Sequence, residues 1–462
     1  MDLPFVVIGG DAAGMSAASK IKREQPDAHV IVFERSPYIS YSACGMPYWI
    51  GGIIESDREL IVLTPGIARK RRGIDVRIRH EVTAIDPAES VVHGINYDTG
   101  QPFTQTYSKL LIATGARPIY PPIPGLDLPG VFALRSLTDA QRIYAYMQEH
   151  AVTSAIVIGG GYVGIEMAEA FRNRQLETHL IERLPQIMPI FDEDMVGAVD
   201  AHLRQQGVQL YTSTEVQEVT AHEGRLLVKT DSGGTISTGL VIVAVGVQPN
   251  AELAASAGLC TGESGAIWVD RHMRTSTVNI FAAGDCVEHY HLALERNTWI
   301  PLATSANKGG RVAGGNMIGE DSSMPGILGT AIVKVFDYTM AITGLTEREA
   351  RQSGLFGTNG EYVGSAVIEN KDKAGYWPGA ETMTVKLVFD KRNGRVLGGQ
   401  LVGKAGVNKR IDIIATAITA RMTLEDVAML DLSYAPPYSP TYDPIQICAN
   451  VGQRQLLPQP SG

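Results

Sequence analysis

Cysteine is scarce in this chain of 462 residues, which holds only four: Cys44, Cys260, Cys286 and Cys448. Their wide separation excludes a disulfide framework, a zinc-finger site and a dithiol redox motif, each of which needs closely spaced cysteines. The ten histidines show no metal-ligand spacing either, so we predict no metal site. A reactive cysteine in this chain must therefore pair with something other than a neighbouring thiol.

Long hydrophobic runs and an excess of positive charge are missing as well. No apolar segment approaches the about 20 residues of a membrane span, and the net charge of −9 argues against general affinity for nucleic acid. The first apolar run, Phe5 to Ile8, has the length of a strand and ends in glycine, so we expect no signal peptide. These features together predict a cytoplasmic protein in a reducing setting.

Glycine, in contrast, is abundant. Its 49 residues indicate many tight turns and close backbone contacts. With 44% hydrophobic and 19% charged residues, the composition is typical of a globular enzyme. A chain of this length is too long for one hydrophobic core, so we expect two or three domains.

The first glycine-rich turn follows a strand expected over residues 4–8. The run Gly9-Gly10-Asp11-Ala12-Ala13-Gly14 leads into a helix that ends near Arg23, and a second strand ends at Glu34. This order is typical of a dinucleotide-binding unit, in which Gly9 forms the turn, Gly14 allows close packing and Glu34 accepts ribose hydroxyls. The helix N-terminus offers N–H groups to a pyrophosphate. Asp11 replaces the middle glycine, so a plain tight turn is the alternative for this motif taken alone.

The same unit recurs after residue 154. A strand over 155–158 leads into Gly159-Gly160-Gly161-Tyr162-Val163-Gly164, which keeps all three glycines of the motif: Gly159, Gly161 and Gly164. The following helix ends near Arg174, and the next strand ends at Glu182. An acid there favours NADH, because the 2′-phosphate of NADPH would face its carboxylate, and Arg183 beside it softens that preference.

Both copies continue alike. Residues 109–118 match residues 240–249, and alternating, turn-broken segments that predict a β-meander precede each of them. The first copy is longer: Gly9 to Gly115 spans 106 positions, whereas Gly159 to Gly246 spans 87.

The largest mismatch between the copies lies in the part that contains Cys44. An insertion on a nucleotide-binding domain is expected to lie along the cofactor and to carry the chemistry. The alternative for a lone cysteine is a small buried packing residue.

The last part of the chain changes character. Residues 277–285 predict a strand that ends in Ala-Gly-Asp, where Asp285 is well placed to bind a ribityl hydroxyl. A small-residue helix is expected over 301–319. Beyond about Gly326 the pattern predicts an α+β domain with strands over 331–336, 362–368, 382–389 and 396–403 and a helix over 407–421. We expect the tail after residue 452 to be frayed.

Together these motifs resemble one family over nearly the whole chain. The two dinucleotide units, the segment Ser40-Tyr41-Ser42-Ala43-Cys44, the Ala-Gly-Asp motif, Tyr376-Trp377-Pro378-Gly379 and Tyr434-Ala435-Pro436-Pro437 are similar to those of flavin-dependent pyridine nucleotide–disulfide oxidoreductases. The chain resembles their single-cysteine branch, which includes CoA-disulfide reductases, persulfide reductases, NADH oxidases and peroxidases. Ala12 stands where the oxidases and peroxidases carry a histidine, which argues against peroxide chemistry.

The resemblance implies an α/β fold with two tandem Rossmann-like dinucleotide-binding domains and a C-terminal α+β dimerisation domain. The expected boundaries are 1–117 with 250–325 for a discontinuous FAD-binding domain, 118–249 for an NAD(P)H-binding domain, 326–452 for the dimerisation domain and 453–462 for the tail. It also implies a homodimer in which Tyr434 enters the active site of the partner subunit.

The resemblance further implies a set of ligand-binding residues. FAD would be held by Gly9, Asp11, Gly14, Glu34, Thr114, Gly115, Gly284 and Asp285, and the nicotinamide nucleotide by Gly159, Gly161, Gly164 and Glu182. The family's CoA contacts fall on Ser16, Lys20, Arg23, Ser40, Arg72 and Asn307. Ala43 and Tyr442 replace an asparagine and a lysine of the family, and both departures weigh against CoA itself as the acceptor.

The main hypothesis is a cycle in which electrons pass from NADH through the flavin to a disulfide at Cys44. The Cys44 thiolate then attacks CoA disulfide, CoA persulfide or polysulfide, and CoA can remain bound as a mixed disulfide. A helix that starts at Gly45 is expected to lower the pKa of Cys44. Tyr376 and Tyr434 are candidate acids for the leaving thiolate, with an interface role as the alternative.

Two other functions stay open. The protein is an NADH oxidase if Cys44 cycles through a sulfenic acid, and a third alternative is a flavoprotein that reduces a protein partner. The choice between NADH and NADPH is open as well. The basic run Arg69-Lys70-Arg71-Arg72 is either a solvated helix face or, at Arg72, an anchor for a CoA phosphate.

Overall fold

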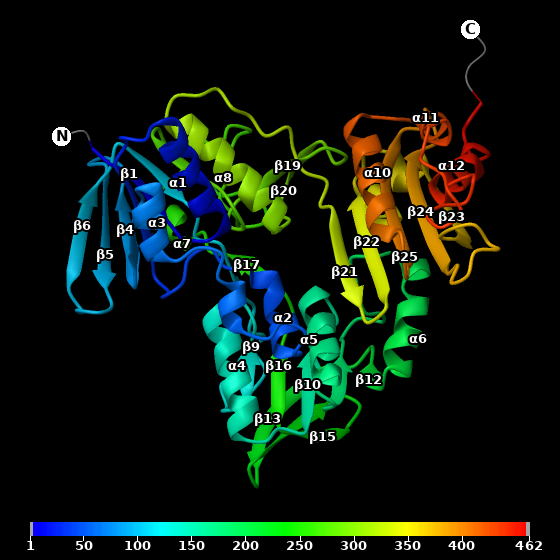
Figure 1. Ribbon diagram of the computed structural model, residues 1–462, viewed down its shortest axis with the longest axis horizontal. Helices are drawn as coiled ribbons and strands as arrows, with labels where there is room; N and C mark the ends of the chain where they lie inside the picture. The colour runs from blue at the N-terminus through cyan, green and yellow to red at the C-terminus, as the bar shows by residue number, and fades with distance from the viewer. Residues whose placement is uncertain (1–2, 459–462) are drawn as a thin grey trace.

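The computed structural model describes residues 3–458 in three regions, which Figure 1 shows spread around a common centre. The first region is built on a five-stranded parallel sheet with the order β18-β7-β1-β2-β3. Its strands are β1 (Phe5–Ile8), β2 (Val30–Glu34), β3 (Asp75–Ile78), β7 (Lys109–Ile112) and β18 (Ile280–Ala282). The apolar runs of the central strands are buried, as a parallel sheet covered on both faces requires.

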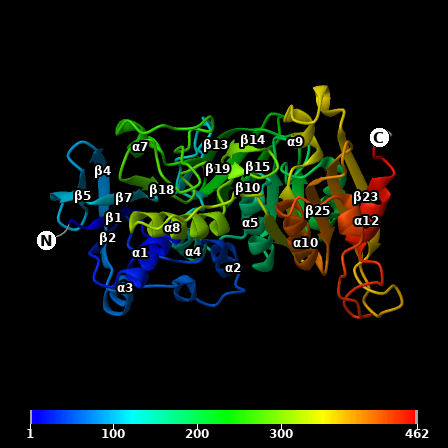
Figure 2. The ribbon, with the colours of Figure 1, turned by 90° about the horizontal axis from the view of Figure 1, so that it is seen from above.

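Helices and a small meander cover this sheet. The helices are α1 (Ala12–Glu24), α3 (Pro65–Arg72), α7 (Glu252–Ser256) and α8 (Ala303–Met317), and the meander consists of β4 (His80–Asp86), β5 (Val91–Asn96) and β6 (Pro102–Thr106). Helices α1 and α8 lie side by side in both views (Figures 1 and 2). A Cβ atom added at Gly310 would lie 2.2 Å from the Ala13 carbonyl oxygen, so the small residues of α8 serve this close packing.

The second region repeats the plan. Its parallel sheet has the order β12-β11-β10-β16-β9, with strands β9 (Val131–Ala133), β10 (Ser154–Ile158), β11 (Glu177–Ile181), β12 (Val208–Tyr211) and β16 (Leu240–Val243). Its helices are α4 (Leu137–Glu149), α5 (Tyr162–Asn173) and α6 (Gly197–Gln205), and its meander is β13 (Val216–His222), β14 (Arg225–Thr230) and β15 (Thr235–Thr238). The tandem Rossmann-like arrangement predicted from the sequence is confirmed.

The inserted segment leaves the first region and packs into the second. It forms a 3₁₀ turn at Ala43–Gly45, helix α2 (Met46–Ile50) and another 3₁₀ turn at Asp57–Leu60. Side chains of α2 join the hydrophobic core of the second region, where Trp49 stacks on Tyr144 with ring centroids 4.8 Å apart. A two-stranded pair, β8 (Ala116–Pro118) with β17 (Val247–Pro249), marks where the chain passes between the regions.

The C-terminal region is an antiparallel sheet with helices, as Figure 1 shows. The sheet order is β21-β22-β25-β24-β23, with strands β21 (Ala331–Val335), β22 (Tyr338–Gly344), β23 (Val363–Lys371), β24 (Thr382–Asp390) and β25 (Val396–Gly403). The helices are α9 (Glu347–Gln352), α10 (Val407–Thr419), α11 (Leu424–Ala428) and α12 (Pro444–Gln453). Earlier in the chain, a hairpin of β19 (His289–His291) and β20 (Arg296–Thr298) precedes α8 of the first region. The predicted α+β character is confirmed.

Two expectations for this region need correction. The sequence pattern missed β22, which follows β21 after a turn without glycine in which Phe336 has a φ of 54°. The tail is also better ordered than expected: Leu457 N–H donates to the Lys391 carbonyl at 3.0 Å, and the Gln455 side chain donates to the Ser365 carbonyl at 2.7 Å. Residues 459–462 of the predicted tail lie outside the described residues.

Candidate active site

The two glycine-rich turns have the same local geometry. Gly9 has a φ of 104° and Gly159 a φ of 106°, conformations that favour glycine. A Cβ added at Gly14 would lie 1.9 Å from the Gly9 carbonyl oxygen, and one at Gly164 would lie 1.9 Å from that of Gly159. These glycines are therefore required by the backbone contact between strand and helix.

The acid at the end of each second strand also has the same partners in both units. Glu34 accepts hydrogen bonds from the backbone N–H groups of Gly10 and Ser36, both at 2.8 Å. Glu182 accepts them from Gly160 at 2.7 Å and Leu184 at 2.8 Å. Each carboxylate is thus fixed beside its glycine turn, where the sequence predicted it would receive a ribose.

Helices α1 and α5 begin without a side-chain hydrogen bond at their N-caps, Asp11 and Gly161. Their first N–H groups therefore remain available to an anion. A Cβ at Gly161 would meet nothing within 4 Å, which leaves room for a pyrophosphate to approach. Both turns fit the phosphates of a dinucleotide.

The remaining predicted FAD residues lie at the carboxyl ends of neighbouring strands of the first sheet. Thr114 and Gly115 follow β7, and Gly284 and Asp285 follow β18. The Thr114 hydroxyl donates to the Asn250 carbonyl at 2.6 Å. Since parallel strands end at one edge, the structure brings these residues to the edge that carries the Gly9 turn.

Arg135 is a site residue that the sequence analysis missed. It follows β9, and its guanidinium makes an ion pair with Asp285 at 2.8 Å. Burial raises the pKa of Asp11 to about 6, and Arg135 opposes that rise. Burial likewise raises the pKa of Asp285, again opposed by Arg135. A cationic side chain from the second region thus faces two carboxylates of the first.

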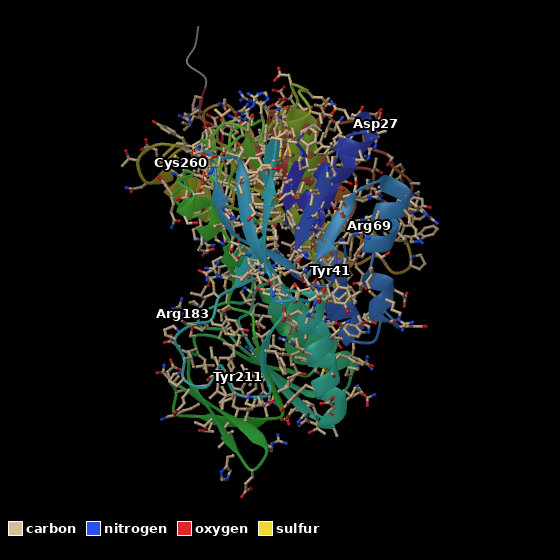
Figure 3. All side chains as sticks on the ribbon, turned by 90° about the vertical axis from the view of Figure 1, so that its left-hand side faces the viewer. Asp27, Tyr41, Arg69, Arg183, Tyr211 and Cys260 are labelled. Atoms are coloured by element: carbon tan, nitrogen blue, oxygen red, sulfur yellow. The ribbon has the colours of Figure 1, made fainter. Side chains whose placement is uncertain are left out.

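Cys44 lies in the 3₁₀ turn just before α2, and its side chain is exposed. Figure 3 shows its neighbour Tyr41 at the waist between the first and second regions, with Cys260 on the other side of the view. The other two cysteines are buried. Among the four thiols, only Cys44 is both exposed and placed between the two dinucleotide units.

The expected lowering of the Cys44 pKa is wrong for the protein without cofactors. Solvent reaches the thiol, but the protein around it shields it in part, and this desolvation raises the pKa of Cys44. The negative charge of Glu166 raises the pKa further, while Arg135 opposes both effects. The helix that follows Cys44 has only five residues, Met46–Ile50, so its dipole is small. The nearby carboxylates therefore have the larger effect.

Glu166 is the second residue that the sequence analysis missed. It lies on α5, which packs against α2, and it accepts a hydrogen bond from the Tyr48 hydroxyl at 3.4 Å. Burial raises the pKa of Glu166 to about 7, although the bond from Tyr48 lowers it. An acidic residue within the small and apolar residues of α5 was the available signal in the sequence.

Tyr376 and Tyr434 are exposed and lie together on the C-terminal region. Tyr376 belongs to the loop between β23 and β24, and Tyr434 to the segment between α11 and α12. A side-chain hydrogen bond with Tyr434 raises the pKa of Tyr376. The structure thus joins the two predicted acids but places them on a region other than the one that carries Cys44 (Figure 1).

The predicted CoA contacts divide into two groups. On α1 and α8, the Ser16 hydroxyl donates to Asn307 at 2.7 Å, and Lys20 pairs with Glu24 at 2.9 Å and Glu320 at 2.7 Å. Arg72, at the end of α3, donates to the Ser19 hydroxyl at 2.8 Å.

The other two predicted contacts differ from these. Arg23 is exposed on α1. Ser40 has a φ of 44°, and its backbone N–H donates to the Gly10 carbonyl at 3.0 Å. Four of the six residues therefore have side-chain contacts along α1, Arg23 is exposed on the same helix, and Ser40 is fixed at the turn.

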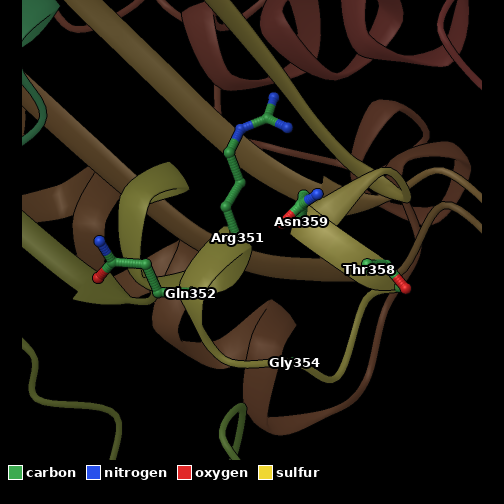
Figure 4. Close-up of a pocket in the computed structure, with 6 residues that line it drawn as sticks. Arg351, Gln352, Gly354, Thr358 and Asn359 are labelled. Atoms are coloured by element: carbon green, nitrogen blue, oxygen red, sulfur yellow. The ribbon is translucent and has the colours of Figure 1, made fainter.

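A surface pocket on the C-terminal region carries no such chemistry. Figure 4 shows it beside α9, with Arg351 and Asn359 among its lining residues. Arg351 is already paired with Glu347 at 2.7 Å and bonded to the Gly360 carbonyl at 3.1 Å. Within residues 3–458 there is also no cluster of three metal-ligating side chains, and no helix long and apolar enough to cross a membrane.

Two dinucleotide units that face one lone thiol define an oxidoreductase of the disulfide-reducing class. The chain belongs to the pyridine nucleotide-disulphide oxidoreductase family, whose model matches residues 3–310, and the dimerisation domain of that family matches residues 330–444. Enzymes of this family use FAD and NAD(P)H.

Several relatives are similar over almost their whole length. The chain is 40% identical over 447 residues to an NAD(P)H sulfur oxidoreductase (CoA-dependent) of Pyrococcus furiosus, covering 96% of this chain and 98% of the relative. It is 34% identical over 454 residues to an NADH oxidase of Methanocaldococcus jannaschii (98% and 99%). It is 30% identical over 436 residues to a coenzyme A disulfide reductase of Staphylococcus haemolyticus (94% and 96%).

A solved structure with the same fold is an NAD-dependent persulfide reductase from A. fulgidus. The TM-score is 0.94 at 40% sequence identity, over 98% of this chain and 83% of that one.

Proposed function

We propose that this protein uses NADH to reduce CoA disulfide, or a CoA persulfide or polysulfide, through the single thiol of Cys44. The observation that supports this most directly is the position of that thiol. It is exposed, lies between two dinucleotide units and has no second cysteine nearby in the sequence. A thiol in this place is suited to form a disulfide with a small-molecule sulfur compound rather than with a neighbouring thiol.

Cofactor binding is proposed on the residues that the sequence predicted. FAD would be held by the Gly9 turn, Glu34, Thr114 and Asp285, and NADH by the Gly159 turn with Glu182. When bound, the two cofactors supply the electron pair that returns a disulfide at Cys44 to the thiol. We favour NADH because both oxygens of Glu182 are held beside the turn by backbone N–H groups, where a 2′-phosphate would be repelled.

The residues of the chain perform the thiol exchange. The Cys44 thiolate attacks one sulfur of R–S–S–R, forms the mixed disulfide Cys44–S–S–R and releases R–S⁻. In a homodimer, Tyr434 of the partner subunit donates its hydroxyl proton to that leaving thiolate, with Tyr376 as its hydrogen-bond partner. Arg135 stabilises negative charge near Cys44, which favours the attacking thiolate.

The outer face of α1 is the proposed CoA-binding surface. Arg23 and Arg72 supply positive charge there, and Ser16 with Asn307 supplies neutral hydrogen-bonding groups. Lys20 lies beside them, paired with Glu24 and Glu320. Phosphates of CoA are recognised by such a set of side chains.

We also propose the domain boundaries predicted above and a homodimer that forms through the dimerisation domain. The four free thiols support a reducing, cytoplasmic setting.

The test is the isolated protein assayed with NADH and CoA disulfide. Wild-type protein is expected to consume NADH and to release two CoA thiols for each NADH. Cys44→Ser should retain reduction of the flavin by NADH but lose essentially all turnover of CoA disulfide, because flavin reduction needs no thiol. Cys260→Ser, which removes the other exposed thiol, is the matched control and should behave like wild type.

A second candidate function is an NADH oxidase with Cys44 as a sulfenic acid, because a lone exposed thiol is also suited to oxidation and one relative carries that name. Oxygen uptake that matches NADH loss, without stimulation by CoA disulfide, would establish it instead. Turnover only in the presence of a protein acceptor would favour the third alternative.

A further inference from the structure

A fully buried arginine lies beneath the two loops that carry Tyr376 and Tyr434. Arg410 on α10 is 0% exposed, and Asp443 and Ser439 are each 1% exposed. An ionised guanidinium in such a dry place is unfavourable unless every donor finds a partner. The partners of Arg410 therefore show what its burial achieves.

Those partners come from both tyrosine-bearing segments. Arg410 Nε donates to both carboxylate oxygens of Asp443, at 3.0 and 3.1 Å. One terminal nitrogen donates to the Asp372 carbonyl at 2.9 Å and to the Ser439 hydroxyl at 3.5 Å. The other donates to the Gly406 carbonyl at 3.3 Å. The forked guanidinium group of Arg410, called the fork below, thus connects two segments that are about seventy residues apart in the chain.

Each partner fixes the base of one segment. Asp372 opens the loop with Tyr376 and closes it on Glu381, whose backbone N–H donates to the Asp372 carboxylate at 2.9 Å. Asp443 ends the segment with Tyr434 and caps α12, where it accepts the N–H of Ile445 at 3.1 Å.

Above the arginine the two segments meet again. The Ala374 N–H donates to the Pro436 carbonyl at 3.2 Å, and the two exposed tyrosines share a hydrogen bond. The exposed pair therefore stands on a buried base that Arg410 holds together.

We propose that Arg410 is a positioning residue that holds Tyr376 and Tyr434 in the relative arrangement used at the active site of the partner subunit. This inference rests on the proposed function, in which these tyrosines protonate the leaving thiolate. Lysine at this position keeps the charge but offers a single point of attachment, so it cannot span both segments. Arg410→Lys therefore separates the geometry of the fork from its charge.

Homodimers of Arg410→Lys are expected to retain flavin reduction by NADH. Their rate of CoA-disulfide turnover should fall about tenfold, because small displacements of a catalytic group have large effects on rate.

Mixed dimers, isolated through two different affinity tags, show in which subunit Arg410 acts. In dimers of Cys44→Ser with Arg410→Lys, the remaining Cys44 meets tyrosines held by an intact Arg410. These dimers should reach about half of the wild-type rate, since one of two sites is complete.

The opposite arrangement is the matched control. A chain with both substitutions, paired with a wild-type chain, leaves one Cys44 that meets tyrosines lacking Arg410, and this dimer should stay about tenfold slower than the first. Equal rates from the two mixed dimers would overturn the role of Arg410. Wild-type dimers without CoA-disulfide turnover would instead overturn the proposed function.

Ser439→Ala provides a second variant if Arg410→Lys does not fold, because it removes one acceptor of the fork and keeps the charge pair. The same two mixed dimers are built with it. A smaller loss in the same direction, confined to the disulfide step, supports the inference, whereas rates equal to wild type in both arrangements contradict it.

Discussion

At the scale of single residues, the environment of Cys44 is the least predictable part of the site. The sequence located the thiol, the glycines and the strand-end acids, since each belongs to a local motif. It did not reveal Glu166 or Arg135, which lie on α5 and after β9 and act on Cys44 through space. Such effects depend on how α2 packs on the second region, which no local pattern encodes.

Glu166→Gln is expected to make the Cys44 thiol more reactive in the protein without cofactors. The pKa of Glu166 is about 7, so this carboxylate is ionised at pH 8.5 and raises the pKa of Cys44. Its removal increases the thiolate fraction, and alkylation by iodoacetamide should accelerate about two- to fivefold at pH 8.5. At pH 5.5, where Glu166 is protonated, the two rates should nearly coincide.

The measurement is made in a Cys260→Ser background, so that Cys44 is the single exposed thiol. Glu149→Gln changes an exposed carboxylate at the end of α4 and serves as the control. An equal rate for Glu166→Gln and its parent at pH 8.5 would show that Glu166 does not affect Cys44.

At the scale of elements, the two dinucleotide units were predictable because strand, glycine turn, helix and acid follow one another in the sequence. The structure extends the likeness of the two units to hydrogen bonds that were not predicted: Glu34 and Glu182 bind their glycine turns in the same way. Strand β22 and the helices after α10 were missed, since no glycine-turn motif introduces them and their formation depends on packing within the C-terminal region.

Matched substitutions in the two turns should separate the two cofactors. A valine at Gly14 or at Gly164 places its Cβ 1.9 Å from a carbonyl oxygen of its own turn, so helix and strand must move apart. Purified Gly14→Val protein should lack most or all of the flavin absorbance of the wild type. Gly164→Val should retain the flavin, but reduction by NADH should be slowed by about a hundredfold or more.

Absorbance of the purified proteins and stopped-flow reduction by NADH measure the two effects, and dithionite reduction controls for an intact flavin site in Gly164→Val. Loss of flavin from both variants to the same extent would contradict the assignment of separate units. A flavin-free Gly164→Val would assign FAD to the second turn.

At the scale of the whole molecule, a charge cluster around a buried lysine joins the second region to the C-terminal region. Lys386 on β24 is 2% exposed and faces Asp192 at 3.1 Å, Asp194 at 2.8 Å and Glu347 at 3.2 Å. Gln400 donates to Asp192 at 2.6 Å. These residues are separated by up to 208 positions in the chain, which is why no local sequence pattern indicated the junction.

The pH dependence of this cluster follows from Glu347. Burial acts to raise the pKa of Glu347, but hydrogen bonds from Ser365, Arg351 and Lys386 outweigh it and lower the pKa to about 2. A carboxylate with a lowered pKa in the folded state stabilises the fold above its ordinary pKa of 4.5 and loses that contribution as the pH falls toward 2. Ionised Glu347 is therefore stabilising at neutral pH, and Lys386 is one of the groups that hold it ionised.

Lys386→Met should destabilise the protein by about 3–5 kcal/mol at pH 7, because three carboxylates then share a junction without their buried cation. Without Lys386, Glu347 loses one of the hydrogen bonds that lower its pKa. Part of Glu347 in the variant is therefore protonated at pH 4, which relieves the repulsion, so the difference from wild type should shrink. Urea unfolding at both pH values measures this difference in the free energy of unfolding. The control is Lys229→Met, which replaces an exposed lysine on β14. A loss of stability that is the same at pH 4 and pH 7 would mean that the variant has lost the packing of the lysine stem rather than the interaction of its charge.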